Sequence, residues 1–215
     1  IAGPGDDAME KMLEGSLSRL HTDYVDIYWI HNPMDVERWT KDLIPLAKSG
    51  KIRKIGVSNH NLAEIKRAQE ILAEGGLSIS AIQNHYSLLH RSSEKAGILD
   101  YCKEHGITFF SYMVLEQGAL SGRYNEAHPF PEGTGRGNSY NSYWKAHGAK
   151  PSQIAGAWAI AKGTLPIIGV TKVYQVEEAA KMADIHLTGD EISSLESLAD
   201  KAGISTLREW EKEMA

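Results

Sequence analysis

Five short apolar runs, each separated from the next by an amphipathic stretch, constrain the fold of this chain more than any other feature. The expected strands cover residues 26–31, 51–59, 78–86, 107–113 and 165–170. Helical spacing of apolar residues predicts helices between them and two more helices at the end of the chain. The strands are continuous apolar runs, which is typical of parallel strands covered on both faces. We therefore expect an α/β protein with a parallel sheet.

Local signals mark the ends of the helices expected at residues 7–20, 35–50, 62–76, 92–107 and 151–163. Asp6 or Asp7 is available to cap the first helix. Pro45 should kink or interrupt the second, whereas Pro151 stands at the first position of the fifth. Cys102 lies within an amphipathic helix, and we expect it to be a small buried core residue.

Two architectures fit this alternation, a (β/α)₈ barrel and a doubly wound open sheet. A dinucleotide-binding sheet of the second kind should carry G-x-G-x-x-G after its first strand, and no expected strand is followed by that pattern. A closed barrel needs eight strands and typically about 250 residues. Five strands in 215 residues therefore predict that three strand–helix units are missing from the amino end.

Residues 114–150 show no clear periodic element, although they include the glycine-rich and aromatic segment GRGNSYNSYWKAHG. A loop of that length is uncommon in a compact domain unless it forms a lid. We interpret it as containing a break in the sequence near residues 141–144. The whole chain, residues 1–215, is then one TIM barrel domain without its amino-terminal strands.

Composition excludes several classes of function. A formal net charge of −5 provides no basic field for nucleic acid or for an anionic membrane. No run of apolar residues is long enough to span a bilayer. The single cysteine excludes an internal disulfide and a cysteine-rich metal site. With no secretion-type amino terminus, we expect a cytoplasmic protein, and its oligomeric state stays open.

Polar side chains lie at the end of every expected strand. They are His31, Ser58, Asn59, Gln83, Asn84, Tyr112, Thr171 and Lys172. Taken singly, most of them are explained as helix caps or capped structural residues. Gln83 is harder to explain in this way, because burying an amide without partners costs a few kcal/mol. Since strand ends meet at one face of a barrel, a shared cavity is the better hypothesis.

The residue types narrow the chemistry of this cavity. Ser58, Asn59 and Gln83 offer hydrogen-bond donors and acceptors that suit a planar carboxamide. Tyr112 offers a flat face on which a ring can stack. Nicotinamide is a carboxamide on a ring, so a nicotinamide site is one interpretation.

A second group of residues is suited to phosphate. Thr171 and Lys172 stand just before a helix amino terminus, which is where barrels bind phosphate. The glycine-bearing loop 115–124 contains Arg123, which suits the approach to a pyrophosphate. Lys172 by itself fits a solvated loop lysine equally well.

Five segments in order resemble the aldo-keto reductase superfamily, from its strand four to its strand eight. They are SLSRLHTDYVDIYWIHNP, GKIRKIGVSNHNLAEI, IQNHYSLL, YMVLEQGALSGRY and LPIIGVTKVYQVEEAA. The resemblance runs from about Asp7 to Lys201. It implies a (β/α)₈ barrel that binds NADP(H) and reduces small aldehydes or ketones.

The resemblance also implies roles for single residues. His31 would orient the substrate carbonyl, and Tyr112 would stack on the nicotinamide. Ser58, Asn59 and Gln83 would hold the carboxamide. The other cofactor contacts would come from Leu115, Gln117 and Leu120 at the pyrophosphate and from Thr171, Lys172, Gln175 and Glu178 at the adenosine end.

The chain departs from the family pattern in two respects. Ala179 follows Glu178 where the family usually has asparagine, and Gln175 replaces a possible arginine. Lys172 must therefore supply most of the charge for a 2′-phosphate, so NADPH is favoured and NADH is possible. The family's general-acid tyrosine, with its lysine and aspartate, lies on strands two and three, which have no counterpart here.

Three hypotheses remain at this point. The first is an oxidoreductase whose amino-terminal third is missing from these residues. The second is a non-enzymatic regulator that binds nucleotide on the same scaffold. The third is an unrelated barrel whose polar strand ends are helix caps.

Overall fold

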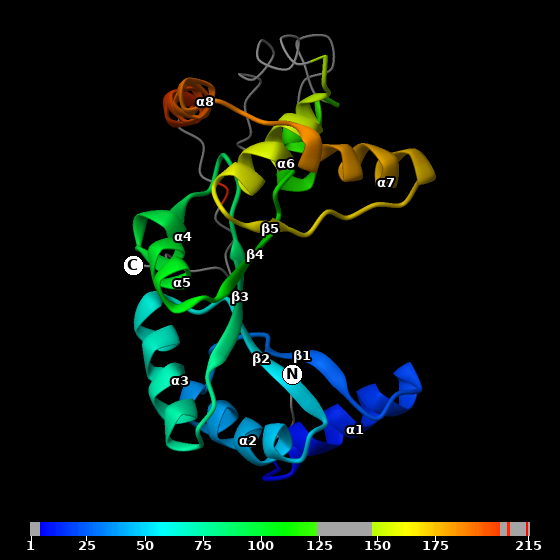
Figure 1. The fold of residues 1–215 in the computed structure, drawn as a ribbon, viewed down its shortest axis with the longest axis vertical. Coiled ribbons are helices and arrows are strands. Elements are labelled where there is room, and N and C mark those ends of the chain that lie inside the picture. Colours follow the sequence, from blue (N-terminus) through cyan, green and yellow to red (C-terminus); the bar gives the residue numbers. More distant parts are fainter. Residues whose placement is uncertain (1–4, 124–147, 203–205, 207–213, 215) are drawn as a thin grey trace. The chain divides into compact units, whose positions relative to one another are not determined.

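The computed structural model describes residues 5–123, 148–202, 206 and 214 of the chain. They belong to two compact units, shown as a ribbon in Figure 1. The first unit consists of Ile1–Gln83, Ala96–Thr108 and Met214–Ala215, and the second of Asn84–Lys95 and Phe109–Glu213. The sequence break expected near 141–144 lies outside the described residues.

The first unit alternates helices with parallel strands. Strand β1 pairs with β2, and β2 pairs with β3, both in parallel. Ile30, Val57 and Ile82 are paired neighbours on the three strands and are all buried, so they form the core on one face of this sheet. The elements are α1 (Ala8–Leu20), β1 (Val25–Ile30), α2 (Val36–Lys48), β2 (Ile52–Ser58), α3 (Leu62–Glu74), β3 (Ile79–His85) and α5 (Ile98–His105).

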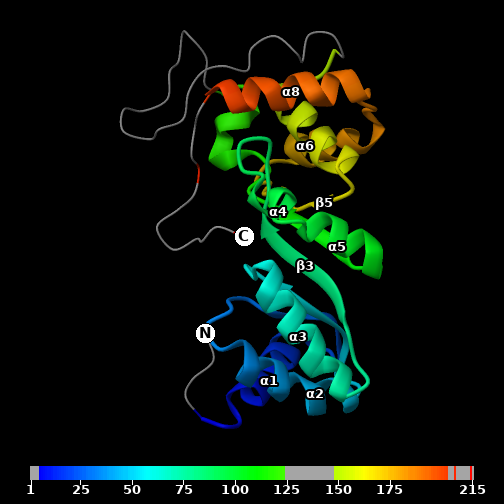
Figure 2. The same ribbon diagram turned by 90° about the vertical axis from the view of Figure 1, so that its left-hand side faces the viewer.

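The second unit is built around helix α6, which is buried from Gln153 to Ala159. A helix that is apolar on all sides needs neighbours on all sides, and α6 contacts η1, β5, α7 and η2. Figure 2 shows α8 lying beside α6. The elements are α4 (Ser92–Lys95), β4 (Thr108–Tyr112), η1 (Glu116–Ser121), α6 (Pro151–Ala161), β5 (Leu165–Pro166), α7 (Val173–Ala180), η2 (Lys181–Asp184) and α8 (Gly189–Ala202).

Two details of the early helices differ from expectation: α2 is not interrupted, and the side chain of Asp7 does not cap α1. Helix α2 continues through Pro45, which is exposed, so water can satisfy the carbonyl that loses its helical partner. Asp7 stands at the N-cap of α1, but its side chain makes no capping hydrogen bond. It pairs with Lys11 instead, at 2.8 Å.

Two later elements are shorter than expected. The helix predicted over 92–107 is two helices, because Gly97 adopts a left-handed conformation with φ of 78° between them. The strand predicted over 165–170 is only Leu165–Pro166, paired in parallel with β4. Pro166 has no N–H to donate to the ladder, and this limits the strand.

Cys102 is buried in α5, as predicted, with 3% of its surface exposed. Burial raises the pKa of its thiol from 9.0 to about 12. The neutral thiol should therefore resist a thiol-reactive probe at pH 8, with labelling only at the rate of unfolding. Stability from this group is present below pH 9 and is lost as pH rises toward 12. Timed labelling followed by mass measurement tests this, and rapid modification of the folded chain would contradict it.

Candidate functional site

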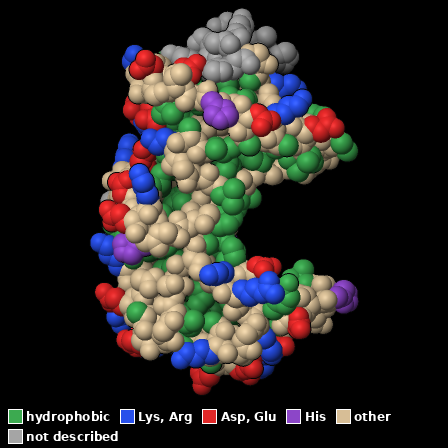
Figure 3. All heavy atoms as spheres, in the orientation of Figure 1, with side chains coloured by type: hydrophobic (Ala, Val, Ile, Leu, Met, Phe, Trp, Pro, Cys, Tyr) green, Lys and Arg blue, Asp and Glu red, His purple; other side chains and the backbone are tan. Residues whose placement is uncertain are grey.

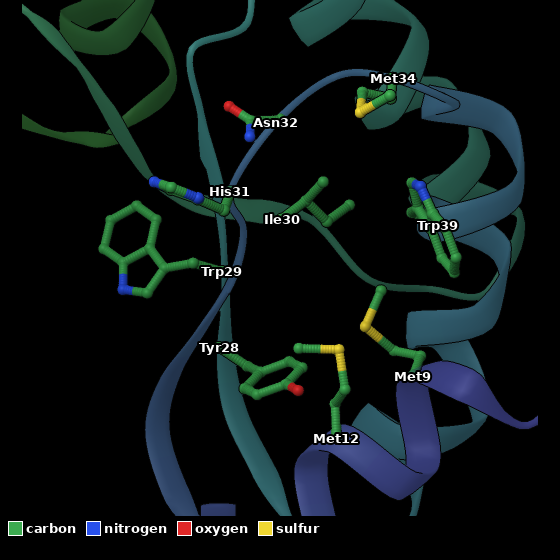
Figure 4. A pocket seen from close by; sticks show the side chains of 9 residues that line it. All are labelled: Met9, Met12, Tyr28, Trp29, Ile30, His31, Asn32, Met34 and Trp39. Carbon is green, nitrogen blue, oxygen red and sulfur yellow. The ribbon is translucent and has the colours of Figure 1, made fainter. Parts of the chain in front are cut away.

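One face of the sheet in the first unit carries three of the predicted site residues. Paired positions on parallel strands point to the same side, and alternate positions along a strand share a side. Trp29 pairs with Gly56, and Ser58 pairs with Gln83. Figure 4 shows the side chains of Trp29 and His31 on one side of β1. His31, Ser58 and Gln83 therefore share one face, at the carboxyl ends of three neighbouring strands.

On this face, the side chain of Trp29 packs directly against the backbone of β2. A Cβ atom at Gly56 would be 2.3 Å from Cε3 of Trp29, so the indole lies directly against the main chain. Only glycine leaves room for the ring at this position. Trp29 is half-buried and His31 is exposed.

Asn59 holds the segment that follows β1. Its backbone is left-handed, with φ of 62°, and its N–H donates to the carbonyl of Gln83 at 3.0 Å. Its side-chain Nδ2 donates to the carbonyl of His31 at 2.9 Å and to Oδ1 of Asn32 at 3.3 Å. Asn59 thus fixes His31 relative to β2 and β3.

Ser58 is deeply enclosed, with 1% of its surface exposed. Its hydroxyl oxygen makes no hydrogen bond within the part of the chain that the structure describes. Leaving a buried hydroxyl without a partner costs free energy. Such a group on a face shared with Gln83 fits a polar ligand that completes the hydrogen bonding.

The opposite face of β1 borders a pocket of about 100 Å³. Tyr28 and Ile30 point into it together with methionines and Trp39 (Figure 4). Burial raises the pKa of Tyr28 above its ordinary value of 10.0, so its hydroxyl stays protonated. Figure 4 shows the side chain of Tyr28 on the opposite side of β1 from the side chains of Trp29 and His31. The lining is Met9, Met12, Tyr28, Trp29, Ile30, His31, Asn32, Met34 and Trp39.

A larger pocket, of about 490 Å³, lies within the second unit. Three of the predicted cofactor residues line it, namely Leu115, Gln175 and Glu178. Arg123 and Lys150 line it as well and contribute positive charge. The other lining residues are Ser121, Gly122, Ser152, Ile168, Gly169, Val170, Tyr174 and Met182.

The amino terminus of α7 is organised by Gln175. Its Oε1 accepts the N–H of Thr171 at 2.8 Å and that of Lys172 at 2.9 Å. Thr171 and Lys172 are exposed and do not line the pocket, although they stand at the same helix end. The helix amino terminus and the nearby cations form an environment suited to phosphate.

The remaining predicted residues have different surroundings. Tyr112 is half-buried, and its ring stacks on His85 with centroids 5.5 Å apart. Gln117 is exposed, whereas Leu120 is buried, and neither lines the larger pocket.

Sequence reasoning missed two groups of residues. Lys150 forms an ion pair with Glu178 at the rim of the larger pocket. The only hint in the sequence was that Lys150 directly precedes Pro151, the first residue of an expected helix. Glu116 and His85 form a fully buried pair, at 2.7 Å, next to Tyr112. A histidine inside the segment IQNHY was the visible hint.

Charged side chains of both signs are interspersed on the face shown in Figure 3. None of the helices that the structure describes is long and apolar enough to cross a membrane. Within those same residues, no cluster of three or more potential ligands from His, Cys, Asp and Glu could hold a metal ion.

Parallel strands that alternate with helices define an α/β protein. The family model for the aldo/keto reductase family matches residues 5–200. This chain therefore belongs to the aldo/keto reductase family, as the resemblance implied.

Individual relatives agree with this assignment. The chain is 29% identical to the NADP(+) aldo-keto reductase yakc of Schizosaccharomyces pombe, over 92% of this chain and 64% of yakc. It is also similar to the crystal structure of the thermostable aldo-keto reductase Tm1743 with the inhibitor epalrestat. That similarity has 31% identity and a TM-score of 0.74, over 90% of this chain and 66% of that chain.

An aldo-keto reductase from Klebsiella pneumoniae in complex with NADPH gives a TM-score of 0.75 at 27% identity. The match covers 98% of this chain and 69% of that chain. These structures confirm the predicted fold class, a TIM (β/α)₈ barrel of which the described strands form part. The chain spans about two thirds of the length of these relatives.

Proposed function

We propose that this chain forms the cofactor side of an NADPH-dependent reductase of aldehydes or ketones. The observation that carries the proposal is the shared face of His31, Ser58 and Gln83. Ser58 and Gln83 offer hydroxyl and amide groups to a carboxamide, and the buried Ser58 hydroxyl fits a ligand that supplies its missing partner. NADP(+) and NADPH appear in the names of the yakc and Klebsiella relatives, which supports this cofactor.

The larger pocket of the second unit fits the adenosine end of the same cofactor. Its volume of about 490 Å³ lies in the usual range for small-molecule sites. Arg123 and Lys150 would neutralise phosphate, and Glu178 offers a carboxylate to donors on the adenosine. NADPH is the preferred form in this proposal, and NADH remains a possible second cofactor.

In the proposed mechanism, His31 donates a hydrogen bond to the substrate carbonyl oxygen and so orients it. Asn59 keeps His31 in place through its backbone carbonyl. When bound, NADPH would supply the hydride. The proton for the carbonyl oxygen would come from the family's tyrosine, assisted by lysine and aspartate, for which these 215 residues contain no counterpart. We further propose one barrel domain over residues 1–215, in a protein of the cytoplasm.

Binding of adenosine 2′,5′-bisphosphate tests the phosphate side of the proposal. We expect Lys150→Ala and Lys172→Ala each to weaken binding about tenfold, as for one lost charge-assisted contact of about 1.4 kcal/mol. Lys181→Ala is the matched control, since this exposed lysine lies outside the pocket lining and at the carboxyl end of α7, whereas Lys172 stands at its amino end. Titration calorimetry with the 215-residue chain provides the affinities. Equal affinities for all variants would contradict the assignment.

Consumption of NADPH tests the catalytic side. In a protein that also contains the family's strands two and three, with the proton-donor tyrosine, we expect NADPH oxidation that depends on an added aldehyde. His31→Ala should slow this oxidation by about 10²-fold. Lys181→Ala again serves as the control. Cofactor binding without any carbonyl-dependent oxidation would favour the non-enzymatic regulator instead.

A further inference from the structure

Glu116 is a fully buried acidic residue of the second unit. Glu116 has none of its side chain exposed, and its partner His85 has 1% exposed. Oε1 of Glu116 lies 2.7 Å from Nε2 of His85 and accepts hydrogen bonds from Ser87 Oγ at 2.5 Å and from Thr206 Oγ1 at 3.3 Å. Three donors converge on this one buried oxygen and supply the hydrogen bonds that it cannot make with water.

The hydroxyl of Ser87 has a defined direction. Its oxygen already accepts the backbone N–H groups of Leu89 and His90, each at 3.1 Å. Its only proton is therefore free to point at Glu116. The backbone of Ser87 also exchanges two hydrogen bonds with His90. These hydrogen bonds fix the Ser87 hydroxyl independently of its contact with Glu116.

Glu116 also lies in a strained part of the chain. Residues 113–118, here called the 113–118 turn, contain three non-glycine residues with left-handed backbones. They are Met113 with φ of 61°, Glu116 with φ of 47° and Gln117 with φ of 54°. Such conformations persist only where the surrounding contacts hold them. The buried hydrogen bonds of Glu116 are contacts of this kind.

Glu116 and its hydrogen-bond partners adjoin two residues with predicted cofactor contacts, Tyr112 and Leu115. The ring of His85 stacks on Tyr112, the residue proposed to stack on the nicotinamide. Glu116 itself belongs to the 113–118 turn, and Leu115 of the same turn lines the larger pocket. The carbonyl of Leu115 accepts the N–H groups of Gly118 and Leu120, so the turn and the pocket wall form one piece of backbone.

We propose that Glu116 is a positioning residue that sets the Tyr112 ring and the 113–118 turn together. Its carboxylate, bound by His85, Ser87 and Thr206, holds the left-handed turn in the shape that presents Leu115 to the dinucleotide. This inference rests on the proposed function, because its ligand is the NADPH proposed above. It assigns no proton transfer to Glu116 or His85.

Glu116→Gln tests the inference, because it keeps the shape of the side chain but replaces the carboxylate by a neutral amide, which weakens the hydrogen bonds from His85, Ser87 and Thr206. Without any cofactor, amide hydrogen exchange over residues 113–122 should accelerate about tenfold, with α3 and α6 unchanged. The affinity for NADPH should fall about tenfold. Ser87→Ala, which removes one donor, should give smaller changes of the same kind and is informative if Glu116→Gln does not fold. Glu104→Gln, at an exposed site on α5, is the control.

The outcomes separate the two proposals. Unchanged exchange over 113–122, or equal acceleration throughout the second unit, overturns the positioning role. Faster exchange over 113–122 with unchanged NADPH affinity also overturns it, while the proposed function stands. An unmodified chain that binds no NADPH, even with the remaining barrel segment present, overturns both.

Discussion

Replacement of Trp158 by alanine is expected to lower the free energy of unfolding by about 3–5 kcal/mol, the usual range for removing a large buried aromatic side chain. Trp158 has none of its surface exposed and stacks on Tyr86 with ring centroids 5.1 Å apart. It lies on α6, around which the second unit is built. The cavity left by the indole could not close without moving this helix.

Trp158 also belongs to a polar network. Its Nε1 donates to Oε1 of Glu196 at 3.1 Å, and Lys162 donates to the same oxygen at 3.0 Å. Lys162 pairs with Glu94, which accepts a hydrogen bond from the hydroxyl of Tyr86 at 2.8 Å. Burial and the neighbouring Glu94 raise the pKa of Tyr86, so this hydroxyl stays a donor. The truncation therefore removes packing and one donor of the network together.

Urea unfolding followed by circular dichroism measures the effect without relying on the lost fluorophore. Trp158→Phe separates the two contributions, because it keeps most of the packing and loses the N–H. We expect that variant to cost about 1–3 kcal/mol. A loss below about 1 kcal/mol for the alanine variant would show that α6 is not the core of its unit.

Replacement of Gly122 by alanine should be nearly as damaging, at about 2–5 kcal/mol. Gly122 has a left-handed backbone with φ of 77°, which costs an L-residue about 1–2 kcal/mol. Its added Cβ would also lie 2.5 Å from Cγ of Pro151, a rigid ring at the start of α6. Overpacking of this kind adds about 1–3 kcal/mol.

Gly163→Ala is the matched control. Gly163 has φ of 80°, but nothing lies within 4 Å of its added Cβ, so only the backbone cost of about 1–2 kcal/mol remains. The difference between the two variants in thermal or urea unfolding isolates the contact with Pro151. Because Gly122 lines the larger pocket, its variant should also bind adenosine 2′,5′-bisphosphate more weakly than the Gly163 variant. Equal stability losses would contradict the role of the contact.

The strand positions could be read from local patterns because parallel strands covered on both faces are continuous apolar runs. Strands β1 to β4 lie within one or two residues of the expected ranges. The errors occur where a single proline or glycine has an effect that the apolar pattern around it does not predict. Pro45 remains inside α2 because its position is exposed, and Gly97 divides a helix that apolar spacing alone made continuous.

The candidate site could be predicted only in part. His31, Ser58 and Gln83 were expected at strand ends, and the register of the sheet brings them to one face. Ser58 and Gln83 are paired residues of neighbouring strands, a relation that follows once parallel pairing is assumed. Their roles in binding remain predictions.

The residues that sequence reasoning missed are joined over long distances in the chain. Glu116 and His85 are 31 positions apart, and Thr206 is 90 positions from Glu116. No periodicity links such residues, because their contact depends on how a turn and a strand end pack together. Lys150 and Glu178, 28 positions apart, illustrate the same limit in the larger pocket.

The amino-acid sequence by itself determined the alternation of helices and parallel strands, the polar strand ends and the family. These features depend on short-range patterns of apolar, glycine and proline residues, which act on the local backbone. Only the tertiary structure decided that Glu116 accepts three hydrogen bonds inside the second unit and that Ser58 is buried without a partner among the described residues. Burial and side-chain pairing depend on distant segments meeting in space, and that meeting is a property of the packed chain.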